Sequence, residues 1–435
     1  MKVKIIKMGI NGEGIAYNNN KPVFVPRALI DEICEIKIVD NQKSYAKAEL
    51  VSIIKESKYR VKPKCKVQHI CGGCPLMVLT VSKQVEYKRE LLIEALIKYA
   101  GIDRRLVGQC VKSPDYLYYR NLLKWPVKMI KDQLYAGMYM EGSNHLVTID
   151  TCIVHDKKID LIKNKVLAVL NKHHQRDYYD KIHKGIRYIV IRGFEKNYQL
   201  TLVTGDNIFT PELIEDLSNI EDIKSIYQNV NTTASHNIMS TDFRNLYGSK
   251  TIELSVNGIK ARLSPRSFFQ LNKKQAEHLY DFVINAIKPC NLLVDAYCGV
   301  GIMSLQALSK AEEVIGIEYV ADAIKNAKMN AKFNHLEKRV DFKVGDSAEV
   351  LKRISKKRTV DAIIVDPPRA GLDDAMIENI IMSKASQLIY VSCNPATLAK
   401  NLNILKEYYN IESITPFDMF THTPHVETVV VMSKK

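Results

Sequence analysis

The 435-residue sequence lacks long apolar runs and is short of acidic residues. No stretch approaches the ~20 apolar residues that a membrane-spanning helix needs, and the start, MKVKIIKMGINGEG, shows neither the apolar segment nor the cleavage site of a signal peptide. These absences predict a cytoplasmic protein that does not associate with membranes. The 48 acidic residues leave the 63 lysines and arginines with a net charge of +15, which favours a polyanionic partner such as nucleic acid. A basic composition without such a partner is the alternative.

The cysteines are odd in number, nine in a long chain, so a secreted disulfide scaffold is disfavoured. The segment CKVQHICGGC places Cys65, Cys71 and Cys74 close together but contains only one C-x2-C pair. Structural zinc sites usually combine two such pairs, so the spacing favours an iron–sulfur cluster, with zinc as the alternative. The fourth ligand must come from a distant part of the chain, and Cys110 and Cys152 are both candidates.

No internal repeat is present, and the hydrophobic pattern changes twice along the chain. Residues 1–57 alternate in short runs between turn residues, which predicts a small β-barrel of the kind that binds oligonucleotides. Residues 58–250 mix strand and helix patterns, which predicts an α+β central domain bearing the cysteines. From residue 251 to 435, helices alternate with apolar strands, so we expect an α/β catalytic domain with a Rossmann-like, mostly parallel sheet. An amphipathic helix at about 85–99 is expected to pack against this last domain.

The segment LLVDAYCGVGIMSL predicts a strand, a glycine turn and a helix that together bind a nucleotide-like cofactor. It lacks the third glycine of dinucleotide-binding turns, and Asp295 ends the strand where a pyrophosphate would otherwise lie. Glu318, at the end of the next strand, suits the two hydroxyls of a ribose. Asp346, after the third strand, can reach an adenine edge. This combination favours S-adenosylmethionine (SAM), whose amino group and sulfonium are cationic.

Two further strand ends carry polar residues that suit methyl transfer to uracil. Asp366 begins DPPR, which lacks the aromatic residue that follows the two prolines in amino-group methyltransferases, and Cys393 ends the next strand. Carbon 5 of uracil is a poor nucleophile, and a thiolate added to carbon 6 converts the ring to a reactive enolate. A base must then remove the proton on carbon 5, and Glu427 is the candidate. Arg369 or a helix N-terminus after Cys393 is expected to lower the pKa of the thiol; a packing role for the cysteine is the alternative.

Taken together, these segments resemble the RNA 5-methyluridine methyltransferase family, and within it the 23S ribosomal RNA branch. GEGIAY, FVPRAL and AKAEL are similar to parts of a TRAM domain, an RNA-binding barrel. CKVQHICGGC with the later IDTC resembles the four-cysteine [4Fe–4S] site of that family. The resemblance therefore implies a cluster held by Cys65, Cys71, Cys74 and Cys152.

The same resemblance implies roles at the active site, through SPRSFFQLN, DAYCGVG, GIE, DPPR, SCNP, HVETV and YYRN. It implies SAM contacts at Gln270, Tyr297, Glu318 and Asp366, a nucleophile at Cys393, a base at Glu427 and a substrate contact at Arg120. The chain departs from the family pattern after CGGC, where Met77, Val78 and Val81 replace a Gln-His pair and a tyrosine. That departure affects expected RNA contacts and leaves the chemistry intact.

The resemblance favours 23S rRNA, free or in an assembling large subunit, as the substrate of a monomeric enzyme. Bacterial tRNA enzymes of the family generally lack both the barrel and the cluster, but some archaeal ones carry both, so a tRNA T-loop uridine is the alternative. A 5-methylcytidine synthase is disfavoured, because those enzymes commonly carry a cysteine where this chain has DPPR. A non-catalytic RNA-binding assembly factor is the remaining alternative.

Overall fold

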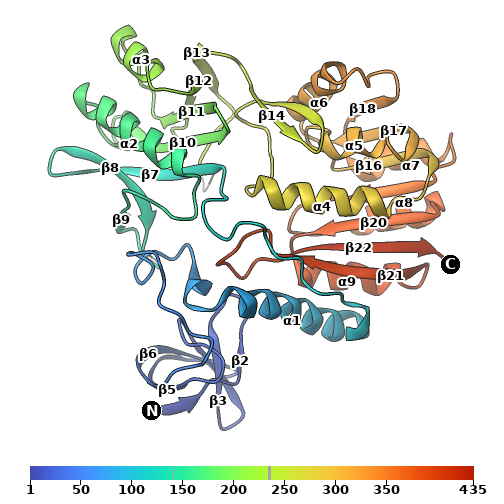
Figure 1. The fold of residues 1–435 in the computed structure, drawn as a ribbon, viewed down its shortest axis with the longest axis horizontal. Coiled ribbons are helices and arrows are strands. Elements are labelled where there is room, and N and C mark those ends of the chain that lie inside the picture. Colours follow the sequence, from blue (N-terminus) through green and yellow to red (C-terminus); the bar gives the residue numbers. More distant parts are fainter. Residues whose placement is uncertain (141, 234–236) are drawn as a thin grey trace.

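The computed structural model describes residues 1–140, 142–233 and 237–435, beginning with a six-stranded barrel at one end of the molecule (Figure 1). Its strand order is β1-β5-β6-β4-β3-β2, and apolar side chains such as Ile5, Val25 and Ile36 fill its interior. Side chains alternate between the interior and solvent, as the period of a strand requires. The strands are β1 (Lys2–Lys4), β2 (Lys7–Met8), β3 (Gly14–Asn18), β4 (Lys21–Val25), β5 (Ile33–Asn41) and β6 (Ala46–Lys55).

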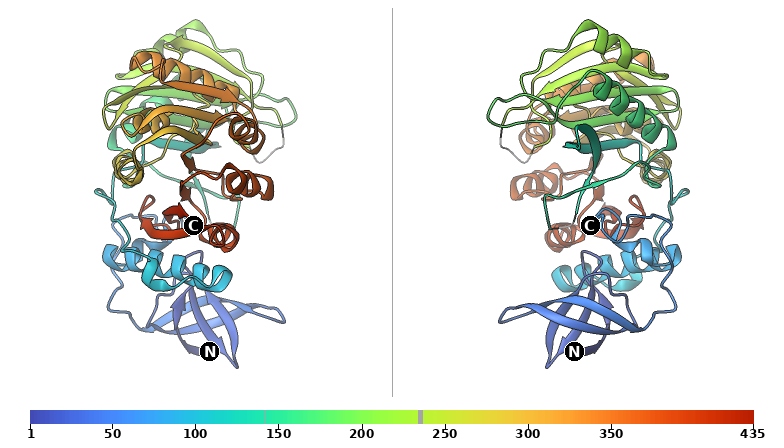
Figure 2. Two further views of the ribbon diagram at one scale, coloured as in Figure 1. Left: turned by 90° about the vertical axis from the view of Figure 1, so that its right-hand side faces the viewer. Right: turned by 90° about the vertical axis from the view of Figure 1, so that its left-hand side faces the viewer.

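A long helix, α1 (Val81–Ala100), joins the barrel to the catalytic domain. It follows the short 3-10 helix η1 (Pro75–Val78) and ends at Gly101, whose φ of 60° provides the left-handed helix end that glycine tolerates. Near its start, Tyr87 packs with barrel and η1 side chains. Near its end, the buried Leu92 and Leu96 belong to the catalytic core. Figure 2 shows the barrel projecting from one end of the molecule, with α1 between it and the rest.

The central domain is a seven-stranded sheet with the order β13-β12-β11-β10-β7-β8-β9. Helices α2 (Lys157–Lys172) and α3 (Pro211–Ser218) pack on it through one apolar core that includes Ile162 and Leu213. A second 3-10 helix, η2 (Arg104–Leu106), precedes this domain. The strands are β7 (Leu122–Ile130), β8 (Gln133–Tyr139), β9 (Leu146–Thr148), β10 (Ile186–Phe194), β11 (Asn197–Thr204), β12 (Ile223–Val230) and β13 (Phe243–Gly248).

The catalytic domain is built on a second seven-stranded sheet, of order β18-β17-β16-β19-β20-β22-β21. Only β22 runs antiparallel to its neighbours. The strands are β16 (Cys290–Ala296), β17 (Ala311–Glu318), β18 (Val340–Val344), β19 (Ala362–Val365), β20 (Gln387–Ser392), β21 (Tyr409–Phe417) and β22 (Glu427–Lys434). A hairpin of β14 (Ile252–Val256) and β15 (Ile259–Leu263) leads into it. The predicted Rossmann-like fold class is confirmed.

Helices cover both faces of this sheet and form two separate apolar cores. The helices are α4 (Lys273–Ala286), α5 (Ile302–Ala307), α6 (Ala321–Phe333), α7 (Ser347–Ser355), α8 (Asp374–Ser383) and α9 (Pro395–Leu405). Because central strands are buried on both faces, they read as continuous apolar runs, and β19 and β20 are buried at every position. Within the described ranges, no helix is long and apolar enough to cross a membrane.

Candidate active site and cysteine segment

Three of the predicted site residues lie at the ends of neighbouring strands. Cys393 directly follows β20, and Glu427 is the first residue of β22. The antiparallel register pairs Ser392 with Thr428, so Cys393 and Glu427 are the next pair beyond it. Asp366 follows β19, which pairs in parallel with β20. The sheet therefore brings a thiol and two carboxyl groups to one edge.

The carboxyl groups at this edge stay protonated to a higher pH than ordinary carboxyl groups. Desolvation, helped by Asp366, raises the pKa of Glu427 to about 8, against a smaller opposing effect of Arg369 and Lys88. Desolvation and the nearby Asp295 raise the pKa of Asp366 to about 7. Both side chains are thus substantially neutral near pH 7. A carboxyl group tuned to this range can accept and return protons under ordinary conditions.

The thiol of Cys393 departs from expectation, because its pKa is raised and not lowered. Burial has the largest effect, and the charges of Glu427 and Asp366 add to it, giving a pKa of about 11. Arg369 acts in the predicted direction but is outweighed. Like charges and a dry environment both disfavour the thiolate. The free enzyme therefore holds Cys393 as a thiol, and its activation depends on losing that proton during the reaction.

Two predicted cofactor residues carry buried polar atoms without a partner among the described residues. Asp295 is fully buried at the end of β16; its Oδ2 accepts a hydrogen bond from Ser304 Oγ at 2.5 Å, and its Oδ1 is unpaired. Burial raises the pKa of Asp295 to about 7, and Glu318 adds to this rise. Gln270 is also buried, and its Oε1 is unpaired. Unpaired buried acceptors are costly, so both atoms fit a ligand that donates hydrogen bonds.

The other predicted cofactor residues surround the turn after β16. The carboxylate of Glu318 accepts hydrogen bonds from the backbone N–H of Gly299 at 3.2 Å and of Val320 at 2.9 Å. Tyr297 is half-buried with a φ of 69°. Asp346 is exposed and caps α7 by accepting from the N–H of Glu349 at 3.0 Å. Because a carboxylate has two oxygens, this cap leaves Asp346 able to accept from a ligand.

Tyr280 on α4 is a residue that the sequence analysis missed. Its pKa is raised by desolvation and then by Asp366, Asp295 and Glu427. The phenol therefore lies among the three buried carboxyl groups and stays a hydrogen-bond donor. A tyrosine in an amphipathic helix looks like an ordinary core residue, so the sequence offers no signal for this position.

The four predicted cluster ligands lie in the same region of the structure. Burial raises the pKa of Cys74, and Cys152, Cys71 and Cys65 each raise it further by their charge. Cys110 lies elsewhere, buried beside Asp418 and Lys88. Among the described residues, no three or more His, Cys, Asp or Glu side chains are arranged to hold a single metal ion.

Arg120 lies close to this cysteine segment. Its charge lowers the pKa of Cys74, and its backbone pairs with His155 on one side and Asn272 on the other. Its Nε donates to the carbonyl oxygen of Leu122 at 3.0 Å. Arg120 therefore stands between the cysteines and the chain segment that follows Gln270, and a contact with the substrate stays a prediction.

A cavity of about 450 Å³ opens beside Cys393. Its lining includes Arg369 and His425 from the catalytic domain, Tyr99 from α1, and Ile10 from the turn between β2 and β3 of the barrel. His425 is exposed, and desolvation lowers its pKa, with Arg369 contributing. The cavity is thus shared by two domains and is open to a large substrate.

Comparison with known proteins gives two family matches and several full-length relatives. Residues 80–435 match the family model of tRNA (Uracil-5-)-methyltransferase, and residues 1–51 match the TRAM domain. An uncharacterized RNA methyltransferase of Streptococcus pneumoniae is 34% identical over 100% of this chain and 98% of its own length. One from Clostridium tetani is 34% identical over 99% of this chain and 95% of its length.

A solved structure extends the likeness to the whole fold. Pyrococcus abyssi tRNA (uracil-54, C5)-methyltransferase, in complex with S-adenosyl-L-homocysteine, has a TM-score of 0.82 and 26% identity. It covers 99% of this chain, and 100% of its own chain is matched. A family match over most of the chain, full-length relatives and the strand-end site agree. The chain belongs to the tRNA (uracil-5-)-methyltransferase family and is a SAM-dependent RNA (uracil-5-)-methyltransferase with an N-terminal TRAM domain.

Proposed function

We propose that this enzyme methylates carbon 5 of a uridine in 23S rRNA through a covalent bond between Cys393 and carbon 6 of uracil. The observation that carries the proposal is the position of Cys393 and Glu427 at the ends of the adjacent, paired strands β20 and β22, beside an open cavity. A uridine must leave its stack to reach such a site, and extrusion costs least where the base is unpaired.

The residues at the strand ends supply a nucleophile and a base. Cys393 Sγ loses its proton to solvent and adds to carbon 6, which places an electron pair on the ring as an enolate. Carbon 5 uses this pair to take the methyl group of SAM, whose bond to the sulfonium sulfur breaks to leave neutral S-adenosylhomocysteine. Glu427, as the carboxylate, removes the proton from carbon 5, and the returning electron pair expels Cys393 as thiolate. Each group must be deprotonated at its step, and both pKa values are raised. The reaction should therefore run faster as pH rises through about 8, where Glu427 ionises, and on toward about 11, where Cys393 does.

The cofactor fits the polar groups around the turn after β16. Asp295 and Gln270 offer the unpaired buried acceptors, and Glu318 suits the ribose hydroxyls. Tyr297, Asp346 and Asp366 are the remaining proposed contacts. A cationic ligand near Asp295 would return that carboxyl group to its charged form, because an opposite charge lowers a carboxyl pKa.

We propose further that Cys65, Cys71, Cys74 and Cys152 hold a [4Fe–4S] cluster, with zinc as the alternative. The effects of the other three thiols on the pKa of Cys74 support a shared site. The donor set is all thiol, which suits either an iron–sulfur cluster or zinc. A cluster of four irons spreads its ligands further apart than one ion does, so it demands less convergence of the side chains. Arg120, beside these cysteines, would contact the RNA.

Two kinds of RNA are candidate substrates, 23S rRNA and tRNA. The combination of TRAM domain and cysteine segment favours 23S rRNA or an assembling large subunit, and we expect the enzyme to act as a cytoplasmic monomer. A tRNA T-loop uridine is the second candidate, favoured by the likeness to the Pyrococcus abyssi enzyme. The net charge of +15 suits the phosphates of either RNA.

Deleting the gene and mapping 5-methyluridine in ribosomal and transfer RNA tests the function. Loss of one or more 5-methyluridines from 23S rRNA is the expected result. Loss from tRNA alone would transfer the proposal to the second candidate, and loss of 5-methylcytidine would overturn both. RNA with 5-fluorouridine at the lost site should form a covalent adduct, since fluorine cannot be removed as a proton. An unchanged mobility of the wild-type protein would contradict the covalent mechanism.

A further inference from the structure

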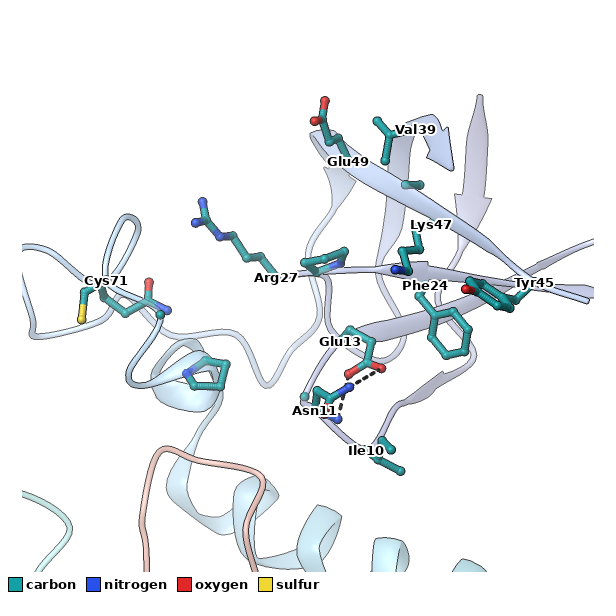
Figure 3. A pocket seen from close by; sticks show the side chains of 16 residues that line it. Ile10, Asn11, Glu13, Phe24, Arg27, Val39, Tyr45, Lys47, Glu49 and Cys71 are labelled. Carbon is teal, nitrogen blue, oxygen red and sulfur yellow. Dashed lines mark hydrogen bonds between the residues drawn. The ribbon is translucent and has the colours of Figure 1, made fainter. Parts of the chain in front are cut away.

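A second groove, of about 650 Å³, lies between the barrel and the cysteine segment, outside the catalytic cavity (Figure 3). Phe24, Tyr45 and Val39 of the barrel line one side, and Gln68 and Cys71 line the other. Its volume falls within the range of about 300–1,000 Å³ typical of small-molecule sites. Nothing in the proposed reaction uses it, so it is available for another part of the substrate.

The barrel side of the groove combines aromatic rings with cations. The rings of Phe24 and Tyr45 meet edge to face with centroids 5.9 Å apart, and Lys47 Nζ lies 5.9 Å from the centre of the Tyr45 ring. Arg27 extends over the gap between the barrel and the cysteine segment in Figure 3. Aromatic surfaces flanked by lysine and arginine are how proteins hold single-stranded nucleic acid, with bases stacked and phosphates paired.

Two acidic residues also line the groove, and their positions leave the aromatic surface accessible. Glu13 is engaged by its own turn, where Oε2 accepts the N–H of Asn11 at 2.9 Å. Figure 3 shows this contact beside Phe24, whereas Glu49 is exposed at the far end of the groove. Lys47 Nζ also lies 4.0 Å from Asp40 Oδ2, a long pair at the surface of the barrel. Such a pair contributes little, so Lys47, like Arg27, can still meet a phosphate.

The groove and the catalytic cavity adjoin at the turn between β2 and β3. Ile10 and Asn11 of that turn line both spaces. Ile10 is 76% exposed, which is unusual for an isoleucine and suits contact with an apolar base face. An RNA strand whose uridine reaches Cys393 can therefore cross this turn and enter the groove.

We propose that the groove binds a second unstacked base of the substrate RNA, near the target uridine in sequence, stacked on Tyr45 and Phe24 with its phosphate beside Lys47 and Arg27. The inference rests on the proposed function, since it takes the RNA strand at Cys393 as its starting point. It assigns the barrel a specific task, which is to hold the target strand open while the uridine lies in the catalytic cavity.

The experiment uses the full-length protein and a single-stranded RNA with one central 5-fluorouridine and a 2-aminopurine at each flanking position in turn. Wild-type protein should change the 2-aminopurine fluorescence at one or more positions. Tyr45→Ala should abolish that change and weaken RNA affinity roughly 5- to 150-fold, the effect of losing one stacked base. Lys47→Ala should weaken binding and reduce the slope of log affinity against log salt by about 1.

Tyr17→Ala is the control, because Tyr17 is a tyrosine of the barrel that is exposed and does not line the groove, whereas Tyr45 is half-buried. It should bind RNA as the wild type does. The proposal would be overturned if Tyr45→Ala kept the wild-type RNA affinity and fluorescence change. It would also be overturned if Tyr17→Ala lost as much RNA affinity as Tyr45→Ala. Adduct formation at Cys393, scored at saturating RNA, reports the proposed function separately. If the wild type forms the adduct but Tyr45→Ala binds RNA as tightly as the wild type, only the groove proposal is wrong. If Tyr45→Ala loses RNA affinity but the wild type forms no adduct, only the covalent mechanism is wrong.

Discussion

The catalytic edge of the sheet and the cysteine segment place their functional cysteines by different physical means. Cys393 follows β20, whose six residues are all buried, and a neighbouring strand fixes its partner Glu427. Cys65, Cys71 and Cys74 lie in a stretch that has no regular element until η1 at Pro75–Val78. One site is positioned by strand register and core packing, and the other by turns and by whatever its thiols bind.

This difference predicts how each region responds to change. A strand end is held by the whole sheet, so replacing its side chain removes chemistry and leaves the fold. A loop held by a metal group gains its order from binding, so replacing one ligand removes folding free energy. Substitutions in the two regions should therefore separate into losses of rate and losses of stability.

The largest effect is expected for Cys393→Ala, which removes the nucleophile. Methyl transfer should fall on the order of 10⁴-fold or more, as for other enzymes that lose the attacking atom. The thermal unfolding midpoint should stay close to that of the wild type, because Cys393 is a half-buried strand-end residue. Cys290→Ala, at the opposite end of the sheet, is the control and should keep full activity. Retained methylation in Cys393→Ala would remove this residue from the mechanism.

Glu427→Gln should lower turnover by about 10²–10⁴-fold, the usual contribution of a positioned base. Because the thiol can still add to uracil, the covalent complex with RNA should accumulate in this variant, measured as a shifted band with unmodified RNA. In the wild type, turnover should rise as pH approaches about 8, where Glu427 loses its proton. A flat pH profile with no accumulated complex would assign the base elsewhere.

The carboxyl group of Glu427 also makes the stability of the fold depend on pH. Its pKa is raised in the folded state, so the folded protein keeps a proton that the unfolded chain releases above about pH 4.5. Stability should therefore fall as pH rises from about 4.5 to 8. Asp295 and Asp366 act in the same direction between about pH 4 and 7. Glu427→Gln should flatten part of this decline in thermal melts of the ligand-free protein.

The strand-end residues were predictable because an apolar run followed by a polar turn marks the carboxyl end of a buried strand. Cys393, Asp366 and Glu427 each follow or begin such a run, and the sheet does bring them to one edge. The raised pKa of Cys393 was not predictable in the same way. Its direction depends on burial and two carboxyl groups outweighing one arginine, and that balance exists only in three dimensions.

Tertiary contacts, both within and between domains, were the part that the sequence left unspecified. Tyr280 looked like helix core, and the groove beside Tyr45 depends on how the barrel meets the cysteine segment. Tertiary packing sets both, and no local pattern encodes it. For the cysteines, spacing indicated the type of ligand, while the approach of Cys152 to Cys74 required the folded central domain.

Cys74→Ser tests the cysteine segment, and we expect this variant to lose both bound metal and stability. The wild-type protein, prepared without oxygen, is expected to be brown and to contain iron and sulfide. The variant should lose most of the iron and several kcal/mol of stability. Cys110→Ser, a buried cysteine outside the segment, is the control and should retain iron. A colourless wild-type protein with zinc would refute the iron–sulfur assignment and retain the four ligands.

Residues 418–422 connect the two regions, and a buried ion pair holds this connection. Lys88 Nζ lies 2.5 Å from Asp418 Oδ1, with both side chains almost fully enclosed. The carbonyl oxygen of His422 accepts the N–H of Leu76, two residues after Cys74, at 3.0 Å. Lys88→Met should cost about 3–5 kcal/mol in chemical denaturation, because it leaves the charge of Asp418 buried without a partner.

The double variant Lys88→Met/Asp418→Leu should recover most of that loss, since replacing both charges by apolar groups removes the uncompensated one. Lys7→Met breaks the exposed pair with Glu94, both partners more than 40% exposed, and should cost about 1 kcal/mol or less. If Lys88→Met proved as mild as Lys7→Met, residues 418–422 would not couple the two regions.

The smallest effect on stability is expected for a substitution at the cofactor site. Its sign is opposite to that of the others, since it should not destabilise the fold. Gln270 is buried with Oε1 unpaired in the described structure, so it costs stability before the ligand binds. Gln270→Leu has a similar volume and should leave thermal stability unchanged or slightly higher without SAM. Affinity for SAM, measured by calorimetry, should fall about tenfold, the worth of one hydrogen bond of about 1.4 kcal/mol. Equal SAM affinity in both proteins would show that Gln270 shapes the site without touching the cofactor, and that its unpaired oxygen has another purpose.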